Sequence, residues 1–293
     1  NVAVGWNASY ALTSGINNAA IGAYSLNQVS TGSYNTGIGR SAAPNMTTGS
    51  YNVAIGSESG TSLSTASSNV MVGTAAGYSQ TTPSGNIAIG YSASYWNQTG
   101  GNNVSVGYYA LNGASANSHS NNTAIGAYAG YSTTTGSYNF IGGVNAGYNL
   151  TSGVNNTFTG YQAGNSVTTG GNNTIIGYDA DASSATVSNE VTIGDANVTR
   201  FRLPGLQAGA SDGQVMTYNS TSGIIELQTS SSGLTGITDS ASPYSTGLGS
   251  GALGATPTGT SNTAVGYNAG AALTSGYQNV FLGTSSGSTM TTG

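Results

Sequence analysis

The sequence carries very little charge: of its 293 residues only 3 are basic and 8 acidic, 4% of the total. An ordinary globular domain carries about 25% charged residues. The three basic residues are arginines, which excludes a protein that binds nucleic acid by neutralising phosphates with basic side chains. Cysteine is absent, which excludes a disulfide scaffold and a zinc site built on thiolates. No apolar run approaches about 18 residues, so we expect no membrane insertion.

Glycine, by contrast, occupies 47 positions and marks an internal repeat. One glycine, here called the anchor glycine, closes a string of the type Asn-x-Ala-Ile-Gly and recurs at intervals of 17 residues, with a single step of 19. The fifteen copies end at Gly5, Gly22, Gly39, Gly56, Gly73, Gly90, Gly107, Gly126, Gly143, Gly160, Gly177, Gly194, Gly249, Gly266 and Gly283. A repeat of this length indicates a stack of similar structural units.

The repeat is too short and too rich in glycine turns for a helical hairpin. Strings such as Val53-Ala54-Ile55 and Thr174-Ile175-Ile176 are typical of strands of three to five residues. A coil of this size has no core of its own, but coils stacked about 4.8 Å apart create one. The sequence therefore predicts an all-β fold, a parallel β-solenoid with a thin interior.

Asparagine stands four residues before the anchor glycine in thirteen of the fifteen copies. We expect these side chains to form a stacked amide ladder, in which each amide bonds to the next coil. The predicted ladder in the first segment comprises Asn18, Asn35, Asn52, Asn69, Asn86, Asn103, Asn122, Asn139, Asn156 and Asn173.

The position two residues before the anchor glycine alternates out of phase with its neighbours, and we expect it to face away from the interior. It is mostly alanine but becomes Ile141, Phe158 and Ile175 in three consecutive coils. An exposed apolar stripe usually marks an interface. These three residues are therefore predicted to line the seam of a homotrimeric fibre.

The strings Asn52-Val53-Ala54-Ile55-Gly56 and Asn122-Thr123-Ala124-Ile125-Gly126 resemble the head repeat of trimeric autotransporter adhesins. The longer units, rich in Thr-Thr-Gly-x-Asn-Asn, resemble repeats of bacteriophage tail fibres. The resemblance implies a homotrimeric β-roll located in a virion or at a cell surface. It favours a phage tail-fibre shaft that presents a receptor-binding tip to the host. The alternative is a bacterial trimeric surface adhesin or extracellular filament subunit.

The regular repeat is interrupted once. We predict twelve coils over residues 1–194, a connector over residues 195–245, and three further coils over residues 246–293. Within the connector, residues 212–218 and 224–228 flank a turn-rich loop and predict a β-hairpin, similar to a spacer of fibre proteins. Because the chain begins and stops inside a repeat, we expect it to be a piece of a longer protein.

Residues suited to catalysis are scattered. The only close acidic pair, Asp179 and Asp181, could form a glycosidase-like dyad or ligate calcium, but a solvated turn is expected, since calcium takes about six to eight oxygen ligands. His119 lies in the two-residue insertion and is expected in a surface loop. The enzymatic alternative is a tailspike that degrades polysaccharide. We predict no enzyme, no cofactor and no metal.

Tyrosine is abundant, with 19 residues that recur at fixed places in the repeat. Stacked rings that seal the coil corners are the expected arrangement. Rings directly after the anchor glycine could instead contact glycan, and Tyr91, Tyr108, Tyr161 and Tyr178 are the candidates. The predicted partners are thus other copies of the chain and a host cell-surface glycan or protein.

Overall fold

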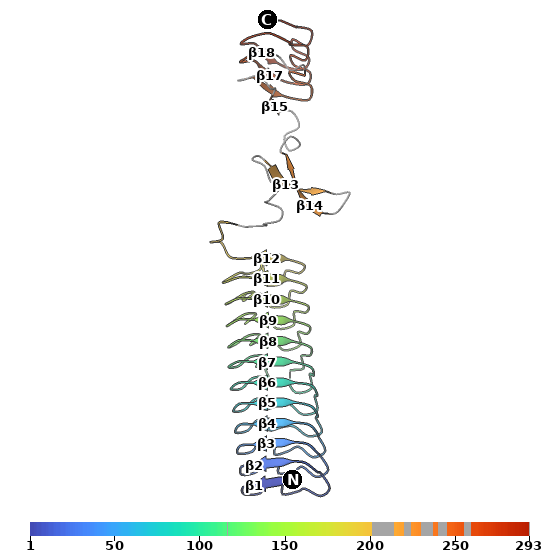
Figure 1. Cartoon of the computed structure of the whole chain (residues 1–293), viewed down its shortest axis with the longest axis vertical. Coiled ribbons are helices and arrows are strands. Elements are labelled where there is room, and N and C mark those ends of the chain that lie inside the picture. Colours follow the sequence, from blue (N-terminus) through green and yellow to red (C-terminus); the bar gives the residue numbers. More distant parts are fainter. Residues whose placement is uncertain are drawn as a thin grey trace. The chain divides into compact units, whose positions relative to one another are not determined.

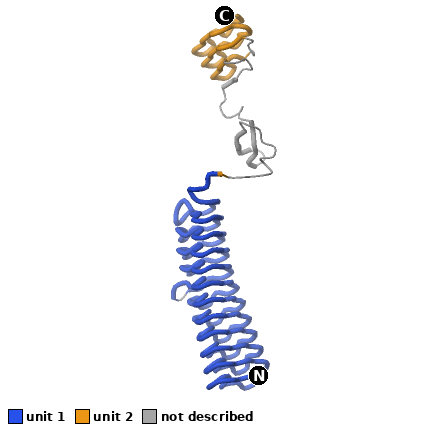
Figure 2. The backbone as a smooth tube through the Cα atoms, turned by 60° about the vertical axis from the view of Figure 1, so that its left-hand side comes forward, with its two compact units in different colours: residues 1–199 blue, residues 200–293 orange. Residues whose placement is uncertain are grey.

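The computed structural model describes residues 1–115, 117–200, 214–219, 224–229, 237–239, 245–254 and 259–292. The chain divides into two compact units, residues 1–199 and residues 200–293 (Figure 2). In the first unit, twelve short parallel strands stack in sequence order into one sheet (Figure 1). They are β1 (Val2–Val4), β2 (Ala19–Ile21), β3 (Thr36–Ile38), β4 (Val53–Ile55), β5 (Val70–Val72), β6 (Ile87–Ile89), β7 (Val104–Val106), β8 (Thr123–Ile125), β9 (Phe140–Gly142), β10 (Thr157–Thr159), β11 (Thr174–Ile176) and β12 (Val191–Ile193). The predicted β-solenoid is confirmed.

The second unit contains the predicted hairpin pairing, because β13 (Gln214–Asn219) runs antiparallel to β14 (Ile224–Thr229). The loop of that hairpin, residues 220–223, lies outside the described residues. Three parallel strands then resume the solenoid: β16 (Thr246–Leu248), β17 (Thr263–Val265) and β18 (Val280–Leu282). The sequence did not predict β15 (Ile237–Asp239), which pairs antiparallel with β16. Within the described residues, no helix is long and apolar enough to cross a membrane.

Each coil is numbered after the strand that it contains, and it begins four residues before the anchor glycine. The anchor glycine is required by the backbone. At Gly5, φ is 129°, and a Cβ atom would lie 2.8 Å from the carbonyl oxygen of Gly22 on the next coil. Only glycine adopts this conformation without strain, and only glycine permits so close an approach. Hydrogen bonds between coils continue beyond the strands, as from Ala11 N–H to the Asn27 carbonyl at 2.9 Å.

The core lies inside the coils and is lined by small residues. The strand centres point inward, as do the residues three and seven positions after the anchor glycine. Two apolar clusters result in the first unit, one around Leu26, Met46 and Met71 and the other around Leu111 and Phe158. Between them the interior is polar, with buried Gln80, Ser94, Asn97, Asn117, His119 and Thr133.

Candidate functional site

The asparagine column forms the predicted ladder, and its ten members in the first unit are buried. Asn35 is representative. Its backbone N–H donates to Asn18 Oδ1 at 2.9 Å, and its Nδ2 donates to the same oxygen at 3.1 Å and to the Gly49 carbonyl at 2.8 Å. Its own Oδ1 accepts the backbone N–H of Asn52 on the next coil at 3.0 Å. Each amide therefore links its own coil to both neighbours, which satisfies buried polar groups that would otherwise destabilise the turn.

Two hydroxyl ladders accompany the amide ladder and were not predicted. In one, a Ser or Thr eight residues after the anchor glycine donates to the same position of the next coil, as from Thr151 Oγ1 to the Thr168 carbonyl at 3.0 Å. In the other, a serine six residues before the anchor glycine accepts a backbone N–H, as Ser50 Oγ does from Ser33 at 3.1 Å. Both positions repeat in the sequence, so the columns themselves contained the signal.

The predicted seam is wrong. Ile141, Phe158 and Ile175 are fully buried inside a single chain, in the second apolar cluster. Space for Phe158 comes from two glycines four residues after the anchor glycine. A Cβ atom at Gly147 or Gly164 would lie 2.9 Å or 2.7 Å from the ring. A large residue at the strand centre together with glycines on its own coil and on the preceding coil is the sequence signal that the strand centres face the interior.

The exposed apolar stripe lies instead on the outer face of the sheet, one and three residues before the anchor glycine. Eleven apolar side chains on this face of the first unit are between 36% and 68% exposed. They are Val2, Val4, Ile21, Ile38, Ile87, Ile89, Ile125, Phe140, Ile176, Val191 and Ile193. No charged residue occurs in the strands β1 to β12, so the outer face is uncharged along the first unit. It is mostly apolar, but β10 presents only Thr157 and Thr159 there. An apolar surface of this length is typical of an interaction surface.

The four tyrosine candidates are exposed but form two separate pairs. Tyr91 stacks on Tyr108 with ring centroids 5.4 Å apart, and Tyr161 stacks on Tyr178 at 5.2 Å. Ala127 and Val144 occupy the same position of the two coils between the pairs, so the column is not one continuous aromatic strip. Only the first pair joins a larger group of rings, through an edge contact of Tyr91 with Tyr109 at 5.4 Å.

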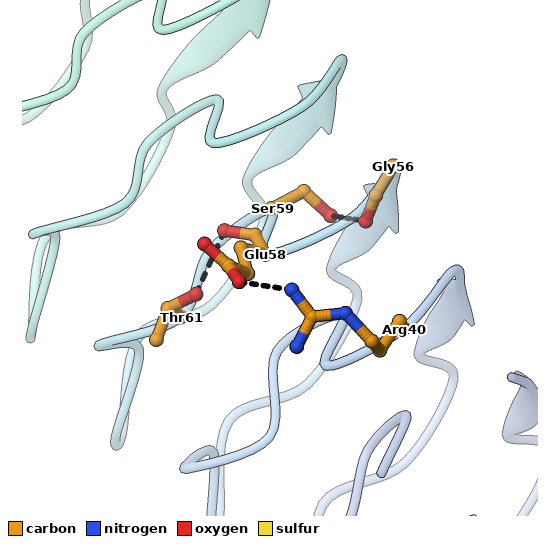
Figure 3. A network of polar contacts seen from close by, with 5 residues as sticks. All are labelled: Arg40, Gly56, Glu58, Ser59 and Thr61. Atoms are coloured by element: carbon orange, nitrogen blue, oxygen red, sulfur yellow. Dashed lines mark hydrogen bonds and ion pairs between the residues drawn. The ribbon is translucent and has the colours of Figure 1, made fainter. Parts of the chain in front are cut away.

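The few charged groups of the first unit serve local contacts. Arg40 and Glu58 form an exposed ion pair between coils 3 and 4, beside hydrogen bonds of Thr61 and Ser59 (Figure 3). An exposed pair of this kind contributes about 0–1 kcal/mol. Asp181 accepts the Ser166 N–H at 3.1 Å, while Asp179 is exposed. Hydrogen bonds from Ser183 lower the pKa of Glu190, which takes the place of asparagine at the end of the ladder.

His119 does not lie in a surface loop, so that prediction is wrong. Its side chain is fully buried, because it replaces the turn glycine and fills the interior of coil 7. Its Nδ1 lies 3.4 Å from Asn103 Oδ1, and Nε2 has no hydrogen-bond partner. Burial lowers the pKa of His119 to about 4. The imidazole is therefore neutral near pH 7.

Acidification is expected to destabilise the first unit through His119. The unfolded histidine has a pKa of about 6.5, so between pH 6.5 and 4 the unfolded chain binds a proton that the folded chain does not. As the pH falls through this window, the free energy of unfolding should fall by about 3 kcal/mol. Above pH 6.5 the imidazole is neutral in both the folded and the unfolded chain, so His119 causes no loss of stability there. Urea unfolding of the native chain and of His119→Gln at several pH values measures the difference. Parallel pH dependences in the two proteins would show that His119 is accessible to water.

The described surface thus offers an uncharged apolar sheet face and clusters of tyrosine rings. Among the described residues, no three histidine, aspartate or glutamate side chains come together. Comparison of the chain with models of protein families, with curated proteins and with solved structures finds no match.

Proposed function

We propose that the chain is part of a non-enzymatic fibre shaft, in which three copies associate through the outer faces of their sheets. The observation that carries this proposal is the uncharged, largely apolar outer face of the sheet, to which every strand of the first unit except β10 contributes an apolar side chain. Exposed apolar patches of this extent are rare on monomers. The stack of coils supplies the stiffness that a shaft requires, because each coil is bonded to both neighbours.

The partner that fits this face is another copy of the same chain. The side chains on the face repeat once per coil, so a second rod laid alongside presents rows at the same spacing. The face has no charge, so identical faces meet without repulsion. A fibre whose chains all run in one direction needs cyclic symmetry about its long axis. We take three as the number of copies from the resemblance to trimeric fibres.

The acidic side chains support a structural role. Glu58 pairs with Arg40, Asp181 accepts a backbone N–H, and Glu190 accepts hydrogen bonds from Ser183 and Thr192. General acid–base catalysis requires carboxylates that face a bound substrate. These three groups are instead engaged within the coils.

Two settings fit such a shaft. The Thr-Thr-Gly-x-Asn-Asn units favour a phage tail fibre that holds a receptor-binding tip away from the virion. The Asn-x-Ala-Ile-Gly string favours the alternative, a trimeric adhesin on a bacterial surface. Antibodies raised against the chain should decorate purified virions in the first case and intact bacteria in the second.

The variant Ile87→Asp/Ile89→Asp is expected to dissociate the trimer. Both side chains are exposed on β6, so the substitutions leave the folded chain intact. In the assembly they would place six carboxylates at one level of the axis, where unpaired charges are costly. Light scattering should show the mass fall to the 28.8 kDa of one chain, with an unchanged circular dichroism spectrum.

Thr65→Asp/Thr82→Asp is the matched control. These threonines are exposed on adjacent coils, away from the outer face of the sheet, and make no hydrogen bond with the described residues. This variant should keep the mass of the native assembly. Retention of that mass by the β6 variant, or its loss in the control, contradicts the proposed interface.

A further inference from the structure

Two open cavities lie on the corner of the coils that follows the strands. The first, of about 330 Å³, is lined by Tyr91, Tyr95, Trp96, Tyr109 and Tyr131 together with Ser92 and Asn112. The second, of about 320 Å³, is lined by Asn145, Tyr148, Asn149, Gln162 and Asn165. All these residues stand one to six positions after an anchor glycine, on coils 6 to 10. The two cavities therefore follow each other along one corner of successive coils, and this stretch is here called the groove.

Aromatic rings make up most of the first part and continue into the second. Tyr131 stacks on Tyr148 with ring centroids 4.9 Å apart, which joins the two parts. Tyr95 contacts Trp96 edge to face at 4.7 Å, and Tyr109 contacts Tyr131 in the same way at 6.1 Å. Withdrawal from water raises the pKa of Tyr95 and of Tyr109, so both phenols remain protonated and can donate hydrogen bonds.

Amide groups make up most of the second part, and three of them are free to bind a ligand. The side chains of Asn145, Gln162 and Asn165 are half-buried and make no hydrogen bond with any described residue. Asn149 differs, because its Nδ2 donates to the Asn165 carbonyl at 2.9 Å. A free amide offers two donors and an acceptor, which matches a hydroxyl group that both donates and accepts.

The lining of both cavities contains no charged residue and no histidine. The nearest acids on the same corner of the coils are Glu58 on coil 4 and, on coil 11, Asp179 and Asp181. A ligand that carries phosphate, sulfate or carboxylate groups would find no counter-charge here, and nucleic acid requires basic contacts. The groove therefore suits a neutral ligand.

We propose that this groove binds a neutral oligosaccharide, with the sugar chain running along the axis of the coils. Sugar rings have apolar C–H faces that pack on aromatic rings, and hydroxyl edges that pair with amides and phenols. The groove offers the two surfaces side by side over five coils. Its residues follow the anchor glycine, whereas the outer face of the sheet precedes it. Binding therefore requires only one chain and is independent of the proposed trimer.

Trp96 provides a spectroscopic probe inside the groove. The chain has two tryptophans, and Trp6 is exposed on coil 1, so Trp6→Phe leaves Trp96 as the only one. Maltoheptaose, cellohexaose and chitohexaose are the neutral probes, and oligogalacturonate is the charged comparison. We expect a saturable change in Trp96 fluorescence with at least one neutral probe, with a Kd below about 1 mM, and none with oligogalacturonate.

Two substitutions in the Trp6→Phe background test the two parts of the groove. Tyr109→Ala removes a ring from the first, and Gln162→Ala removes a free amide from the second. Alanine is tolerated at this position of the coil, since Ala75 occupies it on coil 5. Each variant should weaken binding at least about tenfold. Tyr51→Ala is the matched control, because Tyr51 is an exposed ring stacked on Tyr34 in a different column.

The proposal is overturned if no neutral probe changes the fluorescence up to about 10 mM. It is also overturned if oligogalacturonate binds better than the neutral probes, or if Tyr51→Ala weakens binding as much as Tyr109→Ala. Circular dichroism of each variant shows whether the coils are intact. Gln162→Ala keeps the test decisive should the loss of the Tyr109 ring disturb its neighbours, because it leaves every stacked ring in place.

Discussion

Replacing Phe158 with alanine is expected to lower the free energy of unfolding of the first unit by about 3–5 kcal/mol. The ring is fully buried between Gly147 and Gly164, so its loss leaves a cavity that the rigid coils cannot close. Gly147→Leu alone should also destabilise, because its Cβ atom would meet the ring. The double variant Phe158→Ala/Gly147→Leu should recover much of the loss. Urea unfolding followed by circular dichroism measures each corner of this cycle.

The chain already contains the arrangement that the double variant creates. On coil 2, Leu26 occupies the position of Gly147 with a positive φ, and the strand centre of the next coil is Gly37. A Cβ atom at Gly37 would lie 2.7 Å from the Leu26 side chain. A large side chain at the strand centre is therefore accompanied by glycine four residues after the anchor glycine, and a large side chain at that second position by glycine at the strand centre. Additive losses in the double variant would contradict this account of the core. Phe158→Asp should unfold these coils because it buries an unpaired charge.

Removal of three consecutive ladder amides should melt one section of the rod separately. Each loss of a buried hydrogen-bonding partner costs about 1–3 kcal/mol, so Asn86→Ala alone should lower the melting temperature without unfolding the array. Asn69→Ala/Asn86→Ala/Asn103→Ala concentrates the loss in three adjacent coils. Because coils interact mainly with their neighbours, calorimetry should then resolve an additional transition at lower temperature.

Thr48→Ala/Thr65→Ala/Thr82→Ala is the control for the ladder. These threonines stand on three successive coils, are exposed and make no hydrogen bond within the described part of the chain. Their removal should leave the calorimetric profile nearly unchanged. A triple asparagine variant that melts at the native temperature would show that the amides are not required between coils.

Much of the fold was predictable because a translational repeat puts the same side-chain type in every coil. The period located the strands, and the recurrence of asparagine beside a turn located the amide ladder. Alternation within Val53-Ala54-Ile55 separated two faces of the strand but did not say which is inside. Apolar residues occur on both faces, and the interior is so narrow that alanine, glycine or serine stands at the inward strand centre in nine of the fifteen coils. The pairing of Phe158 with two glycines was the decisive signal.

Other features could not be predicted because they depend on contacts between different positions of different coils. The groove includes one predicted candidate, Tyr91, but combines it with Trp96, Tyr109 and Tyr131, which stand in other columns of the repeat. His119 stands in the one coil that has a two-residue insertion, so its position in the repeat did not indicate which way its side chain points. The strand β15 lies outside the repeat altogether, so no period indicated its pairing with β16.

The mass of the native chain in solution tests the proposed function most directly. We propose that the uncharged outer face of the sheet, exposed in a single chain, is covered by two further copies. Sedimentation equilibrium at micromolar concentration should therefore give three times the 28.8 kDa of one chain, independent of salt because no ion pairs hold the interface. A mass of 28.8 kDa under the same conditions would contradict the proposal, because the apolar face would then be exposed to water in the native protein.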